Sequence, residues 1–284
     1  KLLRYINANC DDLDGKHLLR LIDFFYHKEH LFIVTELLRD NLYEYSKYNR
    51  EAEKKAYFTI PRLQKITKQI LSALSYIHDL KLIHCDLKPE NILIKSYSRS
   101  EIKVIDFGSS CFIHDHLSSY VQSRSYRAPE VILGCSYDYK IDIWSLGCIL
   151  AELLTGYVLF QNESVQGLLS RIVGIIGPFP EYMMKEGRLV ANFFTREGLL
   201  YQEVKEGGEE ESKKGGKKPQ AVQPEDEETK IHILVAKKTT LKQRLQCSDA
   251  YFLDFVRWLL EVDPLKRPTA KEALQHPFLT EQVY

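Results

Sequence analysis

The chain has 284 residues, 44% of them hydrophobic, which is enough to bury one or two sizeable cores. This ordinary composition excludes the fibrous, disordered and membrane classes. Basic and acidic residues each number 39, so no net charge of the whole molecule attracts nucleic acid or anionic lipid. Six cysteines without a CxxC pair favour a reducing, intracellular compartment, the nucleus and/or cytoplasm, over a disulfide framework.

The first half of the chain predicts two strands followed by a long helix. Apolar and polar residues alternate over 18–26 and 31–36, on either side of a polar turn. Pro61 suits the first turn of a helix. The apolar residues that follow it have helical spacing: Leu63, Ile66, Ile70, Leu74 and Ile77.

Two short strands are predicted at 91–95 and 102–105, and the text after residue 138 is mainly helical in period, with a clear helix at 249–260. The most apolar stretch, 143–160, contains Glu152 and two glycines, so it predicts a buried helix rather than a membrane span. The opening residues lack the small-residue cleavage site of a signal peptide.

A charged segment at 203–230 contains nine acidic residues, six lysines, four glycines and no aromatic residue. Such a segment buries too little apolar surface to offset its ordering entropy, so we expect a disordered surface insert. An inert loop is favoured over a partner-docking or regulatory tail.

Three short motifs carry the chemistry and occur in a fixed order: HCDLKPEN at 84–91, DFG at 106–108 and APE at 128–130. Phosphoryl transfer needs charge-stabilising metal ions and an oriented hydroxyl. Asp86 is expected to accept or orient the proton of the attacking hydroxyl, and Lys88 to reach the transferred phosphate. Asn91 and Asp106 offer the oxygen ligands that magnesium prefers. One such residue alone would more often be a turn former, but the ordered set favours catalysis.

With these motifs the chain resembles the protein kinase superfamily over nearly its whole length. The resemblance implies an α+β, two-lobed kinase fold that uses ATP and Mg²⁺. Residues 1–38 are then a remnant of the β-rich N-lobe, formed by the end of a helix and two strands. Residues 39–284 are a complete helical C-lobe that carries the charged insert.

The same resemblance implies further roles for individual residues. Thr35 would be the gatekeeper of the adenine pocket, although an ordinary strand threonine would look the same. ATP-binding positions would be Thr35, Glu36, Leu37, Leu38, Asn41 and Leu93, with backbone groups of Glu36 and Leu38 on adenine and Leu93 beneath it. Asp142 would brace the catalytic loop, and Glu130 with Arg267 would tie the activation segment to the C-lobe. A generic buried ion pair is the alternative reading of that last pair.

Within the superfamily, the chain resembles the dual-specificity tyrosine-phosphorylation-regulated kinase (DYRK) family. The features that carry this likeness are Cys85 in place of the usual arginine, the string DFGSSC, and YVQSRSYR at 120–127. The likeness implies Ser/Thr phosphorylation with a preference for a following proline. It also implies autophosphorylation of Tyr120, whose phosphate would bind Arg124 and Arg127. A packing role for Tyr120 is the alternative.

Two further details qualify the likeness. Ser118 stands where animal members carry the first tyrosine of a Tyr-x-Tyr pair, so the pattern is closer to plant- or protist-type members. Cys85 and Cys111 would lie near the active site, and two small buried hydrophobes are favoured there over a redox-sensitive pair.

Three kinase parts are not found in this sequence: the Gly-rich loop, the ATP-binding lysine and the glutamate that pairs with it. Residues 1–6 resemble the middle of the helix that carries the glutamate. The chain is therefore expected to be part of a longer active enzyme or, alternatively, a catalytically silent docking module. The retained Asp86, Lys88, Asn91 and Asp106 favour the enzyme.

Expected partners are ATP and protein substrates, without direct nucleic-acid or membrane binding, and the protein is expected to be a monomer.

Overall fold

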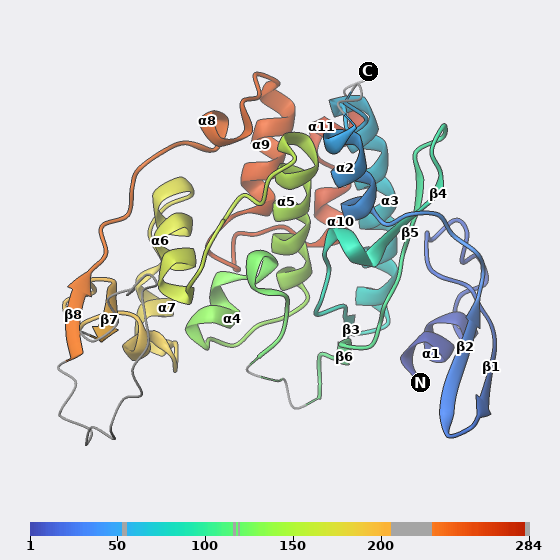
Figure 1. The fold of residues 1–284 in the computed structure, drawn as a ribbon, viewed down its shortest axis with the longest axis horizontal. Coiled ribbons are helices and arrows are strands. Elements are labelled where there is room, and N and C mark those ends of the chain that lie inside the picture. Colours follow the sequence, from blue (N-terminus) through green and yellow to red (C-terminus); the bar gives the residue numbers. More distant parts are fainter. Residues whose placement is uncertain (53–55, 116–117, 119, 206–228, 282–284) are drawn as a thin grey trace, which may run out of the picture.

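The computed structural model describes residues 1–52, 56–115, 118, 120–205 and 229–281. Helices form most of the molecule, and a two-stranded hairpin lies toward each end of its long axis (Figure 1). One hairpin is formed by β1 (Leu21–His27) and β2 (His30–Thr35), close to helix α1 (Leu2–Ala8). The other is formed by β7 (Tyr201–Lys205) and β8 (Thr229–Ile233).

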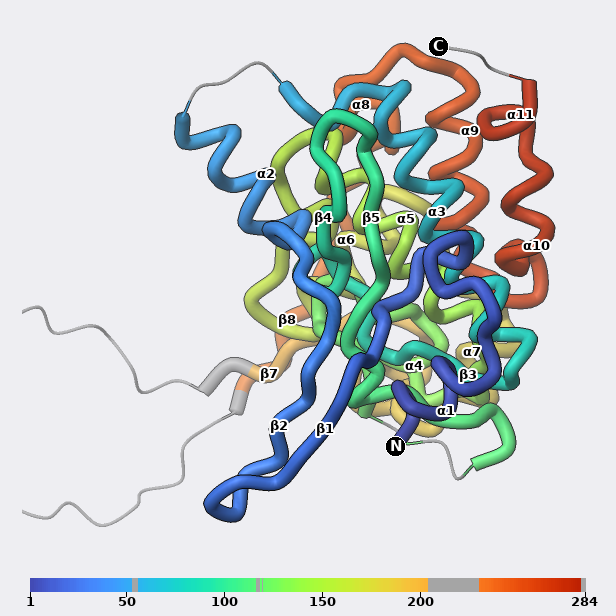
Figure 2. Tube along the Cα trace, turned by 90° about the vertical axis from the view of Figure 1, so that its right-hand side faces the viewer, coloured from blue at the N-terminus to red at the C-terminus, as the bar shows by residue number. Residues whose placement is uncertain are grey.

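The strand, turn, strand prediction for the first hairpin is confirmed. His27 pairs with His30, and the two residues between them, Lys28 and Glu29, have positive φ values of 45° and 64°. Two left-handed residues in a two-residue turn match the right-handed twist of the flanking strands. The first strand begins at Leu21 rather than at Leu18, because buried Leu18 instead forms a parallel bridge with Val104. Figure 2 shows this hairpin projecting from the helical body.

The core is built around two long helices, α3 (Ile60–Asp79) and α5 (Lys140–Thr155), which pack against each other. All five apolar residues that predicted α3 are buried. Helix α5 is buried on nearly all sides and ends at Gly156, whose φ of 79° suits glycine. The predicted helix at 249–260 is confirmed as α9 (Ala250–Leu259), capped by Asp249 and packed on α5. Within the described ranges, no helix combines the length and apolarity that a bilayer crossing requires.

Shorter elements surround this core and position the loops between them. Strands β4 (Ile92–Ser96) and β5 (Glu101–Val104) form the second predicted hairpin, and β3 (Leu82–Ile83) pairs with β6 (Cys111–Phe112). The catalytic-motif residues 84–91 therefore follow β3, and the DFG residues follow β5. The remaining helices are α2 (Leu42–Glu51), α4 (Pro129–Leu133), α6 (Val165–Ile175), α7 (Glu181–Glu186), α8 (Leu241–Leu245), α10 (Ala270–Ala273) and α11 (Pro277–Thr280).

The charged segment predicted to be disordered is ordered at both ends. Residues 203–205 belong to β7 and residues 229–230 to β8, and the two strands pair from Tyr201 opposite Ile233 to Lys205 opposite Thr229. Backbone hydrogen bonds can join two strands whatever the charge of their side chains. Composition alone therefore did not indicate this pairing. Residues 206–228, the centre of the predicted insert, lie outside the described residues.

A charged cluster fixes the N-terminal residues against the β4–β5 hairpin. The Lys103 ammonium, only 1% exposed, lies 2.8 Å from the Asp14 carboxylate and 2.6 Å from that of Glu36. Lys95 contacts the same Asp14 oxygen at 2.6 Å. Hydrogen bonds from Lys103, and then from Lys95, hold the pKa of Asp14 well below its usual range. The buried lysine thereby stabilises the ionised form of Asp14.

This cluster predicts how stability depends on pH. Because the pKa of Asp14 is lower in the folded state, its contribution to stability is present above about pH 4, the unfolded pKa, and is lost as pH falls below that value. Asp14→Asn should therefore lower the melting temperature at pH 7 and have a smaller effect near pH 3. Thermal unfolding followed by circular dichroism measures this, with exposed Asp11→Asn as the control. An equal effect of Asp14→Asn at both pH values would contradict the account.

Candidate active site

The loop that carries the catalytic motif is held by the Asp142 carboxylate, in the first turn of α5. One carboxylate oxygen accepts the backbone N–H of His84 at 2.9 Å, and the other accepts that of Cys85 at 3.1 Å. The Nε2 atom of His78 lies 2.9 Å from the first oxygen. Asp142 is completely buried, so these contacts replace the water that its charge would otherwise need. Cys85 takes a left-handed backbone with φ of 66°, which turns the chain toward Asp86.

Asp86 is oriented by contacts to both of its carboxylate oxygens. Oδ1 accepts hydrogen bonds from the Ser123 backbone N–H at 3.1 Å and from the Ser123 hydroxyl at 2.8 Å. The Lys88 ammonium lies 2.8 Å from Oδ2. Partial burial acts to raise the pKa of Asp86, but the hydrogen bonds from Lys88 and Ser123 outweigh it and lower the pKa overall. The hydrogen bond with Asp86 raises the pKa of Lys88, so the two groups stay oppositely charged.

Asn91 and Asp106 present oxygen atoms that suit a divalent cation. The Asn91 amide nitrogen donates to the Asp86 backbone carbonyl at 2.8 Å, which leaves Asn91 Oδ1 without a donor among the described residues. Ile105, directly before the DFG motif, lies beside Asn91, because its backbone N–H donates to the Asn91 carbonyl at 3.0 Å. Asp106 is exposed, has φ of 61°, and accepts the Gly108 N–H at Oδ1. One amide oxygen and one carboxylate are ligands that Mg²⁺ prefers, so these residues fit the metal.

The chain after β2 carries the predicted adenine-binding residues. Thr35 is half-buried and its hydroxyl donates to the Glu36 carbonyl at 3.2 Å, while the Glu36 N–H donates to the Arg20 carbonyl at 3.1 Å. The backbone of Leu38 makes no hydrogen bond within the described part of the chain, so its N–H and C=O can take a ligand. Leu37 is 98% exposed, and both leucines line a cavity of about 610 Å³. The assignment of adenine to this segment stays a prediction.

Asn41 and Leu93 lie next to each other, joined by an antiparallel bridge. The Asn41 side chain accepts the Glu44 N–H at 2.8 Å and caps the N-terminus of α2. Leu93 is half-buried on β4, opposite Lys103. Asn41 therefore has a structural task whether or not it contacts a nucleotide.

Tyr120 lies beside two arginines on the activation segment, the residues from the DFG motif to the APE motif (106–130). Its side chain is 74% exposed, and the Arg127 guanidinium carbon lies 4.3 Å from the centre of its ring. A hydrogen bond from Arg127, followed by the charges of Arg127 and Arg124, lowers the pKa of Tyr120. Arg127 is itself buried and donates to the Val121 and Gln122 carbonyls. The arginine is thus held in place before any phosphate is present.

The activation segment is joined to the C-lobe by a buried ion pair. The Arg267 guanidinium binds both carboxylate oxygens of Glu130 in α4, at 2.6 and 3.0 Å. Both side chains are no more than 1% exposed. The arginine also donates to the Glu261 and Lys140 carbonyls, so its remaining N–H groups are used. A bidentate pair of this kind fixes α4 relative to the C-terminal helices.

Cys85 and Cys111 come together as the sequence suggested, with their sulfur atoms 3.5 Å apart. Cys85 is buried and Cys111 is half-buried. The hydrogen bond with Cys111 and burial raise the pKa of the Cys85 thiol.

Sequence reasoning missed several residues that support the site. Ser123 binds Asp86 from 37 positions away, a contact that no local spacing reveals. Gln122, with φ of 66°, uses its amide to donate to the Ile141 carbonyl and the Ser145 hydroxyl. Both residues lie in the motif YVQSRSYR at 120–127, and this position was the sequence feature that could have indicated them. His78, on α3, completes the contacts of Asp142.

The fold and the site define the class of protein. Protein kinases combine an aspartate beside a lysine in one loop with a nearby Asn and Asp pair and with a segment that a buried ion pair anchors. The described residues show this combination. The sequence profile described as the protein kinase domain matches residues 6–279, and the chain belongs to that family. Its relatives place it with the DYRK and YAK1 kinases.

Three relatives illustrate this placement. The serine/threonine-protein kinase ppk15 of Schizosaccharomyces pombe is 40% identical, over 98% of this chain and 53% of its own length. Dual specificity tyrosine-phosphorylation-regulated kinase 3 of Mus musculus is 38% identical, over 95% of this chain and 44% of its own. The dual specificity protein kinase YAK1 homolog of Arabidopsis thaliana is 37% identical, over 98% of this chain and 31% of its own. Fungal, animal and plant relatives are thus similarly distant, and the expected closeness to plant or protist members stays a prediction.

A solved crystal structure of a kinase domain has the same fold. It superposes with a TM-score of 0.78 and 28% sequence identity, over 98% of this chain and 81% of that chain. The chain spans about half or less of the length of the three relatives from Schizosaccharomyces pombe, Mus musculus and Arabidopsis thaliana.

Proposed function

We propose that the protein transfers the γ-phosphoryl group of ATP to serine or threonine hydroxyls of protein substrates, and that it phosphorylates its own Tyr120. The observation that carries the proposal is the pair of contacts that orient Asp86: Ser123 on one carboxylate oxygen and Lys88 on the other. Membership of the protein kinase family and the names of the DYRK relatives support it.

The reaction forms a bond between the substrate oxygen and the γ-phosphorus and breaks the bond from that phosphorus to the leaving ADP oxygen. Asp86 takes the hydroxyl proton, and its lowered pKa keeps it ionised and ready to accept. Lys88, held 2.8 Å from Asp86, places a positive charge where the negative phosphoryl group passes. Mg²⁺ bound with ATP neutralises phosphate charge, and Asn91 Oδ1 and the Asp106 carboxylate would hold it.

The ATP base is proposed to bind beside β2, at the backbone of Glu36 and Leu38, above Leu93. Support comes from the backbone groups of Leu38, which have no hydrogen-bond partner among the described residues, and from the exposed Leu37 beside them. A threonine at position 35 is small enough to leave the space behind the base open. We further propose a preference for proline after the acceptor residue, which the likeness to the DYRK family implies.

The first prediction concerns Asp86. In the full-length protein, Asp86→Asn should lower kcat for a basic or Ser-Pro-containing peptide at least about 100-fold, because the proton acceptor is lost. Incorporation of labelled phosphate from Mg²⁺ and ATP measures this, and thermal unfolding verifies the fold. Asp79→Asn, an exposed change on α3, should leave kcat unaltered. Full activity of the Asp86 variant would remove the residue from its role, whereas an inactive wild-type protein would favour a silent docking module.

The second prediction concerns Tyr120. Peptide mass spectrometry of the purified full-length protein should find phosphate on Tyr120 in the wild type and none in Asp86→Asn, since the same site would carry out both reactions. A phosphate there would gain two charge-assisted contacts, to Arg124 and Arg127. Phosphorylated Tyr120 in the Asp86 variant, expressed alone in a bacterial host without tyrosine kinases, would contradict self-phosphorylation.

A further inference from the structure

A groove separate from the nucleotide site runs between α6 and the segment 234–239 that follows β8. Its volume is about 610 Å³, and its apolar surface comes from Ile175, Leu234 and Val235. Val235 is 87% exposed and follows half-buried Leu234, so the groove offers an apolar contact at its surface.

The two walls of this groove are fixed to each other by direct backbone contact. The Thr239 N–H donates to the Gly174 carbonyl of α6 at 2.9 Å, and the Leu234 N–H donates to the Leu200 carbonyl at 2.8 Å. Gly174 permits this approach, because a Cβ atom there would lie 2.5 Å from the Lys237 carbonyl oxygen. The groove is therefore a built feature of the C-lobe rather than a loose loop.

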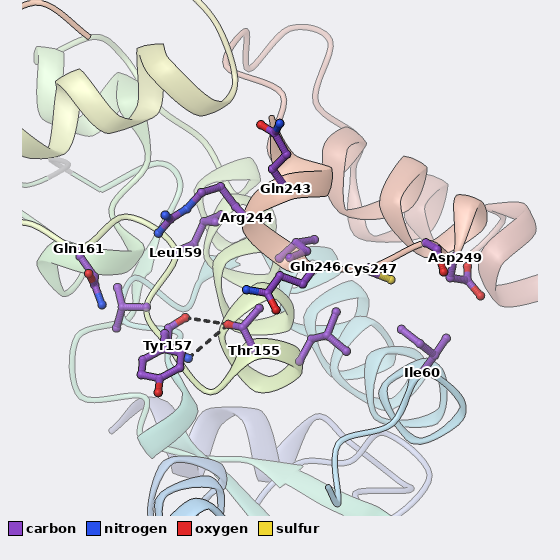
Figure 3. A pocket seen from close by; sticks show the side chains of 14 residues that line it. Ile60, Thr155, Tyr157, Leu159, Gln161, Gln243, Arg244, Gln246, Cys247 and Asp249 are labelled. Atoms are coloured by element: carbon purple, nitrogen blue, oxygen red, sulfur yellow. Dashed lines mark hydrogen bonds between the residues drawn. The ribbon is translucent and has the colours of Figure 1, made fainter. Parts of the chain in front are cut away.

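The rim of the groove is positively charged. Arg171, Lys237 and Arg244 all line it, and within the described residues none of the three has an acidic side chain at ion-pair distance. Arg244 belongs to α8, whose start is fixed by a capping box between Thr240 and Gln243. Figure 3 shows Arg244 projecting from α8 over the neighbouring cavity toward Leu159. The chain has zero net charge, so three cations without an acidic partner among the described residues give this groove a local positive charge.

Two further cavities lie on the side of this groove that faces Asp86. A second cavity, of about 710 Å³, shares Gly167 and Arg171 with the groove and extends to Ser125 and Glu163. The Glu163 carbonyl accepts a hydrogen bond from Arg124, which lines the cavity at Asp86. The cavity at Asp86 and the cavity at Arg171 are therefore neighbours, linked by the hydrogen bond between Arg124 and Glu163.

We propose that this groove docks an acidic segment of a protein substrate, with carboxylates on Arg171, Lys237 and Arg244 and an apolar side chain against Val235 and Leu234. Charge complementarity selects the occupant, because a neutral or basic segment would leave the three cations unpaired. The binding itself does not depend on catalysis. The description of the partner as a substrate rests on the proposed kinase activity and on the neighbouring positions of the cavities.

The test compares two matched charge reversals in the full-length protein. One variant carries Lys237→Glu and Arg244→Glu in the groove, and the control carries Lys68→Glu and Arg257→Glu, exposed cations on α3 and α9. The probe is a short fluorescent peptide in which glutamates flank leucine and phenylalanine, and fluorescence anisotropy without ATP measures its affinity. We expect the groove variant to bind at least about tenfold more weakly than wild type and the control to bind as wild type does.

Two further measurements complete the test. A matched peptide with glutamine in place of glutamate should bind the wild type as weakly as the acidic peptide binds the groove variant. A substrate peptide fused to the acidic segment should show a lower KM than the substrate alone, and this gain should vanish in the groove variant with kcat unchanged. Equal affinity of wild type and groove variant, or equal loss in the control, would overturn the docking site. Intact binding without any phosphate transfer would instead contradict the proposed activity.

Discussion

The site depends on one buried carboxylate, that of Asp142. A charge in the core is costly unless hydrogen bonds replace its water, and here the backbone N–H groups of His84 and Cys85 do so. The position of the carboxylate in the first turn of α5 is also favoured by the helix dipole. Because α5 is buried on nearly all sides, the loop at 84–91 takes its position from a helix inside the core. Asp86 and Asn91 follow within that loop.

The local motifs and the long-range contacts differ in how well sequence predicts them. The helical period of Leu63 to Ile77 predicted α3 because all these residues face one core. The ordered motifs predicted residues that the structure brings together, Asp86, Lys88 and Asn91, and their catalytic roles stay a prediction. Ser123 was missed because its contact with Asp86 depends on how the activation segment folds back across the loop. The early start predicted for β1 was wrong because Leu18 is buried against a different strand.

The polar ends of the charged segment show a second limit of sequence reasoning. Composition describes whether side chains can form a core, and by that measure 203–230 is unsuited to order. Strand pairing uses backbone groups, and five residues on each side pair around this segment. The β7–β8 hairpin matters for the proposed docking, because the segment that follows β8 forms one wall of the cationic groove. The proposed recognition of charge is therefore local, in a molecule whose net charge is zero.

The central claim is that Asp142 holds the catalytic loop in its working position. Amide hydrogen exchange in the wild type and in the isosteric Asp142→Asn variant tests it most directly, because the amide can replace only one of the two carboxylate acceptors. The account predicts that exchange at His84 and Cys85 accelerates and phosphate transfer falls, while the amides of α3 and α9 stay protected. A folded variant with unchanged exchange in the loop and unchanged transfer would contradict it.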